Sequence, residues 1–326
     1  MKAVGHTEFG GPEVLKTFEV PSPVPGPDEV RIKVYAATVN PADFYLRDGR
    51  LAGVVAGFRP PYIPGVEAAG IIDAVGAEAG DRLKVGDRVT AHVMPLTQLG
   101  GAYAEEVVTK AVWTVKAPRN ASFIEAATLP MNGMTALSAV KRSGAAEGST
   151  IAVIGAAGAV GGYALQLAKA AGARVIADAA PGDRELVLSL GADIVVERGT
   201  GLDDRLLAAS PGGVDGIVDA AGYGTSVIRA IRPQGAYVFV AGAPEDADLA
   251  LAREKRINVH SVFVPNVPEP VRLLERLREL VESGQLTLRV QQTFAPEEAP
   301  AAHALLAAGG TRGRLVLEFR AEEPGA

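Results

Sequence analysis

Residues 1–120 alternate apolar and polar positions over short stretches, the pattern of strands with one buried face. The clearest case is residues 29–35, Glu-Val-Arg-Ile-Lys-Val-Tyr. Residues 66–75 and 88–94 have a related pattern, and Gly86-Asp87 marks a turn before the second of them. We therefore predict a β-rich first segment.

The pattern changes after Ala121. Ser122 and Glu125 have the spacing of a capping box for a short helix, and a second helix is predicted over 133–141. Short β-branched runs then alternate with helical stretches, the longest of which covers 160–171. The runs are 151–154, 174–177, 194–196, 216–218, 237–240 and 258–264. Strands alternating with helices indicate a parallel sheet with right-handed crossovers.

In the last segment, from residue 265 onward, predicted helices and strands are mixed. Residues 268–283 have the apolar spacing of an amphipathic helix, followed by a strand over 286–290, a helix over 297–308 and a strand over 314–319. We predict that this tail completes the first domain. The expected domains are thus 1–121 with 265–326, and 122–264.

Composition narrows the classes of function. A chain of 326 residues suits two domains, and its formal net charge of −6 disfavours a nucleic-acid partner. It has no cysteine, which excludes disulfides and thiolate metal sites. We see neither a signal core nor a membrane span, so we expect a cytoplasmic protein with no membrane partner.

The most informative segment is a glycine-rich turn between a predicted strand and helix. It consists of Gly155, Ala156, Ala157, Gly158, Ala159, Val160 and Gly161. Small residues let the backbone approach a pyrophosphate, and the helix N-terminus offers unpaired N–H groups to that anion. The alternative is a tight turn without a nucleotide, but the position inside a βαβ unit favours a dinucleotide site.

The end of the next strand bears on the choice between NAD and NADP. Asp178 stands where a carboxylate accepts from a ribose 2′-OH, which favours NAD. Arg184 and Arg198 are able to pair with a 2′-phosphate, which favours NADP. Each arginine has the alternative of being a solvated surface charge.

At this point the chain resembles the medium-chain dehydrogenase/reductase superfamily, and within it the zinc-free quinone oxidoreductase group. The likeness is carried, in order along the chain, by residues 39–49, 63–70, 85–89, 155–161 and 313–317. It implies an α/β protein built from a GroES-like β domain and a Rossmann domain with a doubly wound parallel sheet. That architecture agrees with the β, α/β and mixed rhythm described above.

The resemblance also bears on zinc. The family's zinc alcohol dehydrogenases have a cysteine ligand where this chain has Asn40 and a histidine ligand where it has Val66. Asn and Val do not make a zinc shell, and the four histidines do not fall at ligand positions, so we expect no metal. Without zinc, the favoured substrates are small and already electrophilic: quinones, or alkenes conjugated to a carbonyl.

Four polar or aromatic positions match the family's active site. Asn40 and Asp43 resemble a polar pair near the nicotinamide ribose, although turn chemistry and helix capping are the alternatives. Tyr45 resembles an active-site tyrosine able to bond a quinone oxygen or deliver a proton, and Tyr62 is a second candidate. For Tyr45, the alternative is a half-buried tyrosine at a domain edge.

Other positions resemble cofactor contacts of the family. Thr135 matches a residue near the cofactor phosphates, Phe263 the segment that meets the carboxamide, and Arg314 a base that reaches the adenosine phosphate. Gly222 and Gly242 follow predicted strands at the carboxyl edge of the sheet, where ligands bind. An ordinary helical threonine and a packing phenylalanine are the alternatives for Thr135 and Phe263.

These observations favour hydride transfer from NADPH to a quinone. Reduction of an enone or enoyl thioester is the alternative, and a nucleotide-binding module with little turnover is a third reading. NADP(H) is preferred over NAD(H) because most of the resembled group uses it, although residues 178–181 lack that group's Ser or Thr. A homodimer is expected, because the strand at 258–264 would leave an exposed sheet edge.

Overall fold

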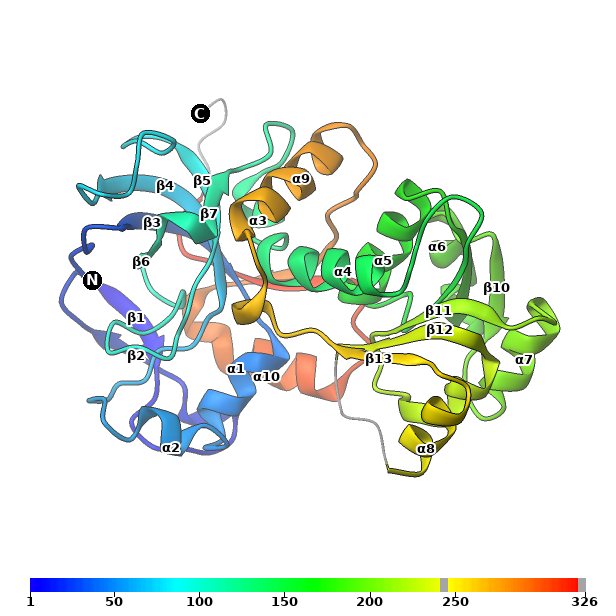
Figure 1. The fold of residues 1–326 in the computed structure, drawn as a ribbon. Coiled ribbons are helices and arrows are strands. Elements are labelled where there is room, and N and C mark those ends of the chain that lie inside the picture. The colour runs from blue at the N-terminus through cyan, green and yellow to red at the C-terminus, as the bar shows by residue number, and fades with distance from the viewer. Residues whose placement is uncertain (241–245, 322–326) are drawn as a thin grey trace. The chain divides into compact units, whose positions relative to one another are not determined.

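The computed structural model describes residues 1–240 and 246–321 (Figure 1). Its internal contacts form two compact units. Unit 1 contains 1–131, 269–283 and 288–326, and unit 2 contains 132–268 and 284–287. Residues 122–131 therefore group with the β-rich unit, whereas we expected them in the Rossmann domain. The reason is that Phe123 and its neighbours pack on Tyr35 and Ala36 of that unit.

Unit 2 holds a six-stranded sheet among its described residues, in the order β10-β9-β8-β11-β12-β13. Every neighbouring pair runs parallel. This is the doubly wound Rossmann order, which confirms the predicted fold class. The strands are β8 (Thr150–Ile154), β9 (Arg174–Ala179), β10 (Ile194–Glu197), β11 (Val214–Asp219), β12 (Ile231–Phe239) and β13 (Asn258–Ser261).

Helices cover both faces of this sheet. In Figure 1, α5 and α6 lie on one face and α8 lies on the other. The central strands β8, β9 and β11 are buried on both sides, which explains why their sequences are mostly apolar. The helices are α4 (Pro130–Arg142), which begins in unit 1, α5 (Ala159–Ala170), α6 (Arg184–Ser189), α7 (Leu202–Ala209) and α8 (Asp246–Glu254).

Unit 1 is built on a seven-stranded sheet in which β3 is central. Its order is β14-β15-β3-β4-β5-β7, with β6 also paired to β3, and a separate pair joins β1 to β2. The strands are β1 (Lys2–Gly5), β2 (Lys16–Glu19), β3 (Glu29–Thr38), β4 (Glu67–Val75), β5 (Arg88–His92), β6 (Glu106–Lys110), β7 (Thr114–Lys116), β14 (Val290–Phe294) and β15 (Arg314–Glu318).

Most of the tail returns to unit 1, where β15 pairs with β3, but residues 265–268 and 284–287, which we expected there, group with unit 2. Five helices of the described residues accompany this sheet: α1 (Pro41–Arg47), α2 (Ala52–Val55), α3 (Phe123–Ala126), α9 (Pro270–Glu282) and α10 (Ala299–Ala308). The main core combines inward residues of β3, β4 and β5 with those of α10 and β15. No helix among the described residues has both the length and the apolar character needed to cross a membrane.

One predicted strand is wrong. Residues 286–290 were expected to be a strand, but the strand begins at Val290. The cause is that Leu286 is buried and the amide of Thr287 donates to Oε1 of Gln166 at 2.9 Å, a side chain of unit 2. The apolar residue thus packs outside any sheet.

Close strand packing at Gly70 gives a test of this fold. A Cβ added to Gly70 on β4 would lie 2.0 Å from the carbonyl oxygen of Lys33 on β3. Gly70→Ala should therefore lower the free energy of unfolding by about 1–3 kcal/mol, measured by denaturant titration. Gly53→Ala is the matched control, since its Cβ meets open space in α2. Equal stability of the two variants would contradict the described β3–β4 packing.

Candidate active site

The glycine-rich turn of unit 2 joins β8 to α5. Gly155 has φ +79°, a left-handed conformation that suits glycine, and Gly158 is the N-cap of α5. A Cβ on Gly161 would lie 2.1 Å from the carbonyl oxygen of Gly155. Glycine is thus required where the first turn of the helix rests on the preceding turn.

The same turn fits the diphosphate of a dinucleotide. Gly158, the N-cap residue of α5, has no side chain of its own that would cap the helix. Ala156 and Ala157 add no polar or bulky group to the turn. The positive end of the α5 dipole and its small residues together favour an anion at this place.

Asp178, near the end of β9, supports this turn directly. Its Oδ1 accepts from the amide of Gly155 at 2.7 Å and from that of Ala156 at 3.3 Å. Burial raises the pKa of this carboxyl group, although the two amides lower it. The other oxygen, Oδ2, is buried without a hydrogen-bond partner among the described residues. A buried carboxylate oxygen of this kind is chemically suited to accept from a ribose hydroxyl.

Several predicted cofactor positions share one edge of the unit 2 sheet. Because the strands are parallel, their carboxyl ends meet there. Gly155 follows β8, Arg198 follows β10, Gly222 follows β11 and Phe263 follows β13. The order of strands changes direction between β8 and β11, which is where doubly wound sheets bind ligands.

The remaining predicted positions of unit 2 differ in setting. Arg184 opens α6 and Arg198 follows β10, and both are exposed. Phe263 is 63% exposed, so it is not the packing residue of the alternative interpretation. Thr135 is buried in α4. Gly242 lies outside the described residues.

In unit 1, the side chain of Asn40 is fixed inside a buried polar cluster. Asn40 follows β3, caps α1 and is only 2% exposed. Its Oδ1 accepts from Nη2 of Arg314 at 2.9 Å, and its Nδ2 donates to Oε1 of Glu67 at 3.1 Å. Nδ2 also donates to the hydroxyl of Thr38 at 3.1 Å. The amide orientation is thus set by charged partners on both sides.

The centre of this cluster is an ion pair between Arg314 on β15 and Glu67 on β4. Nη2 of Arg314 lies 2.6 Å from Oε1 of Glu67, and both side chains are almost fully buried. The other oxygen of Glu67 accepts from the amide of Met131 in the first turn of α4, at 2.7 Å. Arg314 was expected to reach an adenosine phosphate. The structure instead places its guanidinium inside unit 1, because β15 pairs with β3 in a register that sets Val316 opposite Thr38 and Arg314 near Asn40.

Asp43 lies next to this cluster and accepts three hydrogen bonds. Its Oδ2 accepts from the amide of Asn40 at 2.8 Å and from the hydroxyl of Tyr103 at 3.1 Å, and its Oδ1 accepts from the amide of Gly65 at 3.0 Å. Burial raises the pKa of Asp43 to about 7, against the opposing effect of these donors. The hydrogen bond from the Asn40 amide to Asp43 is the helix cap that we named as the alternative role of Asp43. With a pKa of about 7, the carboxyl group of Asp43 titrates near neutral pH.

The two tyrosine candidates are less enclosed. Tyr45 on α1 is 43% exposed, and the guanidinium carbon of Arg50 lies 3.9 Å from its ring centroid. Tyr62 stacks on Phe9 with ring centroids 5.6 Å apart. Tyr45 therefore presents an accessible phenol beside a cation, whereas Tyr62 belongs to an aromatic cluster.

Ligands for a metal are not gathered in the described part of the chain. No group of three or more His, Cys, Asp or Glu side chains is placed to hold an ion there. At the positions of the family's zinc ligands, Asn40 is bonded within the polar cluster and Val66 is buried.

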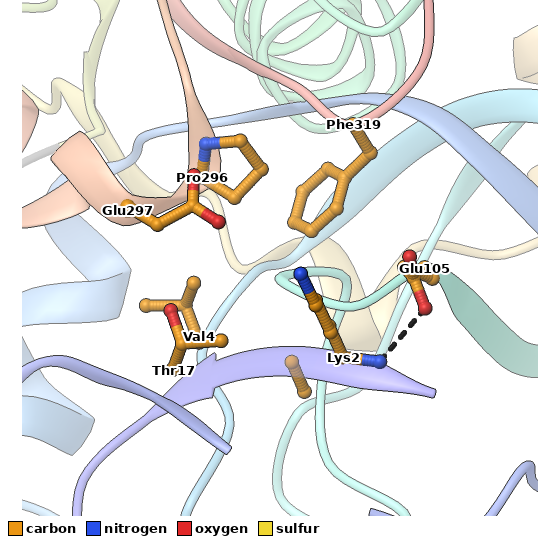
Figure 2. Close-up of a pocket in the computed structure, with 8 residues that line it drawn as sticks. Lys2, Val4, Thr17, Glu105, Pro296, Glu297 and Phe319 are labelled. Atoms are coloured by element: carbon orange, nitrogen blue, oxygen red, sulfur yellow. Dashed lines mark hydrogen bonds between the residues drawn. The ribbon is translucent and has the colours of Figure 1, made fainter. Parts of the chain in front are cut away.

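A separate pocket lies on unit 1 (Figure 2). It measures about 230 Å³, and its wall contains Lys2, Glu105, Glu297 and Phe319. The amide of Lys2 donates to Glu105 across it at 2.7 Å. None of the predicted site residues lines this pocket, and its size is below the usual range for cofactor sites. We assign it no part in catalysis.

Our sequence analysis gave no role to Glu67, Tyr103 or Arg47, and said of His303 only that it is not at a ligand position. All four belong to the buried polar network of unit 1. A signal did exist for two of them. Glu67 interrupts the apolar run from Ile63 to Ile72, and His303 is the one polar residue between Ala301 and Ala308. A buried charged or polar residue requires a partner.

Comparisons with known proteins agree with this geometry. The family model described as "Alcohol dehydrogenase GroES-like domain" matches residues 26–119, and the one described as "Zinc-binding dehydrogenase" matches 190–317. A quinone oxidoreductase of Lama guanicoe is 31% identical over 97% of both chains. An NADPH-dependent alkenal/one oxidoreductase of Arabidopsis thaliana is 33% identical over 74% of this chain and 63% of its own.

Solved structures show the same relationship. The quinone oxidoreductase from Coxiella burnetii superposes with a TM-score of 0.85 at 29% identity, covering 98% of this chain and 99% of its own. The sequence likeness spans both units, as the resemblance predicted. The chain belongs to the medium-chain dehydrogenase/reductase superfamily and, within it, to the quinone oxidoreductase group.

Proposed function

We propose that this oxidoreductase transfers hydride from NADPH to a quinone. The observation that carries the proposal is the turn from Gly155 to Gly161, where glycine alone fits the backbone contact beneath the N-terminus of α5. Its family is known to use a nicotinamide dinucleotide, and the quinone oxidoreductases among its relatives support the substrate class.

The chain's own residues have separate tasks in this reaction. The amides at the start of α5 bind the diphosphate, and Asp178 holds the glycine turn in place through the amides of Gly155 and Ala156. Asn40 and Asp43 orient the nicotinamide ribose, and Tyr45 donates a hydrogen bond or a proton to the substrate oxygen. The bound nicotinamide supplies the hydride, and quinone reduction takes up one proton in addition.

The second candidate function is reduction of an alkene conjugated to a carbonyl. The alkenal/one oxidoreductase among its relatives favours this candidate. The same residues serve both reactions, since each needs an oriented dinucleotide and a proton donor near an electrophilic substrate. In this case the proton is added to carbon rather than to a quinone oxygen.

NADP preference rests on the charges near the end of β9. Oδ1 of Asp178 is engaged by the glycine turn, so this carboxylate is held toward the diphosphate side of the site. Arg184 and Arg198 are exposed cations on segments that follow β9 and β10. A guanidinium pairs well with a 2′-phosphate, which NADP alone carries.

We also propose a homodimer formed through β13. This strand is the last in the unit 2 sheet, and an uncovered edge favours pairing with another strand. Pairing of two such edges about a twofold axis would extend the sheet across both subunits.

A substrate screen tests the proposed reaction. NADPH consumption should accelerate with a benzoquinone more than with an enone or an enoyl-CoA, and a chelator should leave the rate unchanged. A preference for the enone or the thioester would favour the second candidate. Tight NADPH binding without turnover of any substrate would favour a binding module, and activity lost to the chelator would contradict the metal-free reaction.

Replacing the two arginines tests the cofactor preference. Arg184→Gln with Arg198→Gln should raise the Kd of NADPH about tenfold, because a charge-assisted bond to phosphate contributes more than 1 kcal/mol. The Kd of NADH should stay within twofold. Fluorescence titration of both cofactors provides the measurement, and an equal loss for NADH would contradict the assignment.

A further inference from the structure

Four buried side chains of unit 1 form one continuous hydrogen-bonded chain. Nη1 of Arg47 lies 3.0 Å from Nδ1 of His303, and Nε2 of His303 lies 3.0 Å from the hydroxyl of Tyr103. That hydroxyl donates to Oδ2 of Asp43 at 3.1 Å. These residues come from α1, α10 and the loop before β6, and all four are buried.

The direction of every proton in this chain follows from Arg47. A guanidinium only donates, so Nδ1 of His303 must accept. Burial lowers the pKa of His303 to about 3, and the neutral ring carries its single proton on Nε2. Nε2 therefore donates to the oxygen of Tyr103, and the hydroxyl proton points to Asp43. Arg47 is itself held in place, since its Nε donates to the carbonyl of Gly10 at 3.2 Å.

A hydroxyl proton of Tyr103 that points to Asp43 stabilises the ionised carboxylate and disfavours the protonated carboxyl group. The carboxylate receives three donors: the amides of Asn40 and Gly65 and the hydroxyl of Tyr103. A proton on Asp43 would need an acceptor. The hydroxyl oxygen of Tyr103 could accept that proton only if the hydroxyl's own proton pointed to Nε2 of His303. Both ring nitrogens of His303 would then face donors, although a neutral imidazole can accept at only one of them.

We propose that His303 and Tyr103 are positioning residues. Because Arg47 can only donate to His303, His303 donates to Tyr103 and Tyr103 donates to Asp43; we call this ordered series of hydrogen bonds the relay. These two residues favour the ionised form of Asp43 against the effect of burial, so that its carboxylate holds the amides of Asn40 and Gly65. The consequence for hydride transfer rests on the proposed function, in which Asn40 orients the nicotinamide ribose. The relay within unit 1 does not depend on that function.

The groups around Asp43 shift its pKa, some upward and some downward. Burial and the charge of Glu67 on β4 raise the pKa of Asp43, while its three hydrogen-bond donors lower it. The charges of Arg314 on β15 and Arg47 on α1 lower the pKa of Tyr103. Arg47 and His6 lower the pKa of His303, in addition to the larger effect of burial. Asp43 therefore titrates near pH 7, where the loss of one donor changes its ionisation measurably.

Tyr103→Phe tests the relay without any cofactor. Loss of the hydroxyl should raise the pKa of Asp43 by about one pH unit, a tenfold gain in proton affinity. The pKa of Asp43 in the folded state is above its ordinary value, so its proton stabilises the fold at low pH, and this stabilisation is lost as pH rises through about 7. The Tm gap between the wild type and this variant should thus widen by about 2–4 °C from about pH 6 to about pH 8.5.

Two substitutions of His303 separate the relay from packing. Gln reaches the Nε2 position and donates to Tyr103, whereas the shorter Asn reaches only the Nδ1 position. His303→Asn should reproduce the pH-dependent gap of Tyr103→Phe, and His303→Gln should show little of it. Tyr35→Phe is the matched control, since it removes a tyrosine hydroxyl elsewhere in unit 1.

Titration of NADPH across the same pH range connects the relay to function. In Tyr103→Phe, the pH below which NADPH affinity falls should move up by about one unit. A Tm gap that is independent of pH, or identical behaviour of the Asn and Gln variants, would overturn the relay. If the wild-type protein binds no NADPH, the proposed function fails while the Tm result still decides the relay.

Discussion

The contact of Gly161 with the carbonyl of Gly155 is the constraint on which the cofactor site depends. It brings the first turn of α5 against the end of β8, and an added Cβ would meet only backbone atoms there. Asp178 bonds the turn amides from β9 and fixes the same geometry. The proposed diphosphate site thus results from backbone packing supported by a carboxylate, with no long side chain from the turn itself.

In unit 1, the main constraint is the burial of two charged side chains. Arg314 and Glu67 are both withdrawn from water, which is costly unless every donor and acceptor finds a partner. Asn40, Thr38 and the amide of Met131 supply those partners. The result is a buried polar cluster in which Asn40 is bonded to both members of the ion pair. We interpret the cluster as the element that orients Asn40 for the cofactor.

Hydrophobic periodicity predicted the alternating strands and helices of unit 2, and the glycine turn was predicted as well. In unit 1 it missed the short strands β1, β2, β6 and β7 and the short helices α1 and α2. The inward orientation of Arg314 could not, because it depends on the pairing of β15 with β3, which are far apart in sequence. Likewise, the link from Arg47 to Asp43 joins three distant segments that no local pattern connects. Residues 286–290 show the converse: an apolar run is not a strand where it packs against other side chains.

The affinity of Gly161→Ala for NADPH tests the central claim most directly. The added methyl group would displace the turn beneath α5, so the Kd should rise at least about tenfold, a loss of roughly 1.4 kcal/mol. Gly212→Ala, whose Cβ meets open space in unit 2, should bind NADPH as the wild type does. Unchanged NADPH affinity in a folded Gly161→Ala protein would contradict a dinucleotide site at this turn.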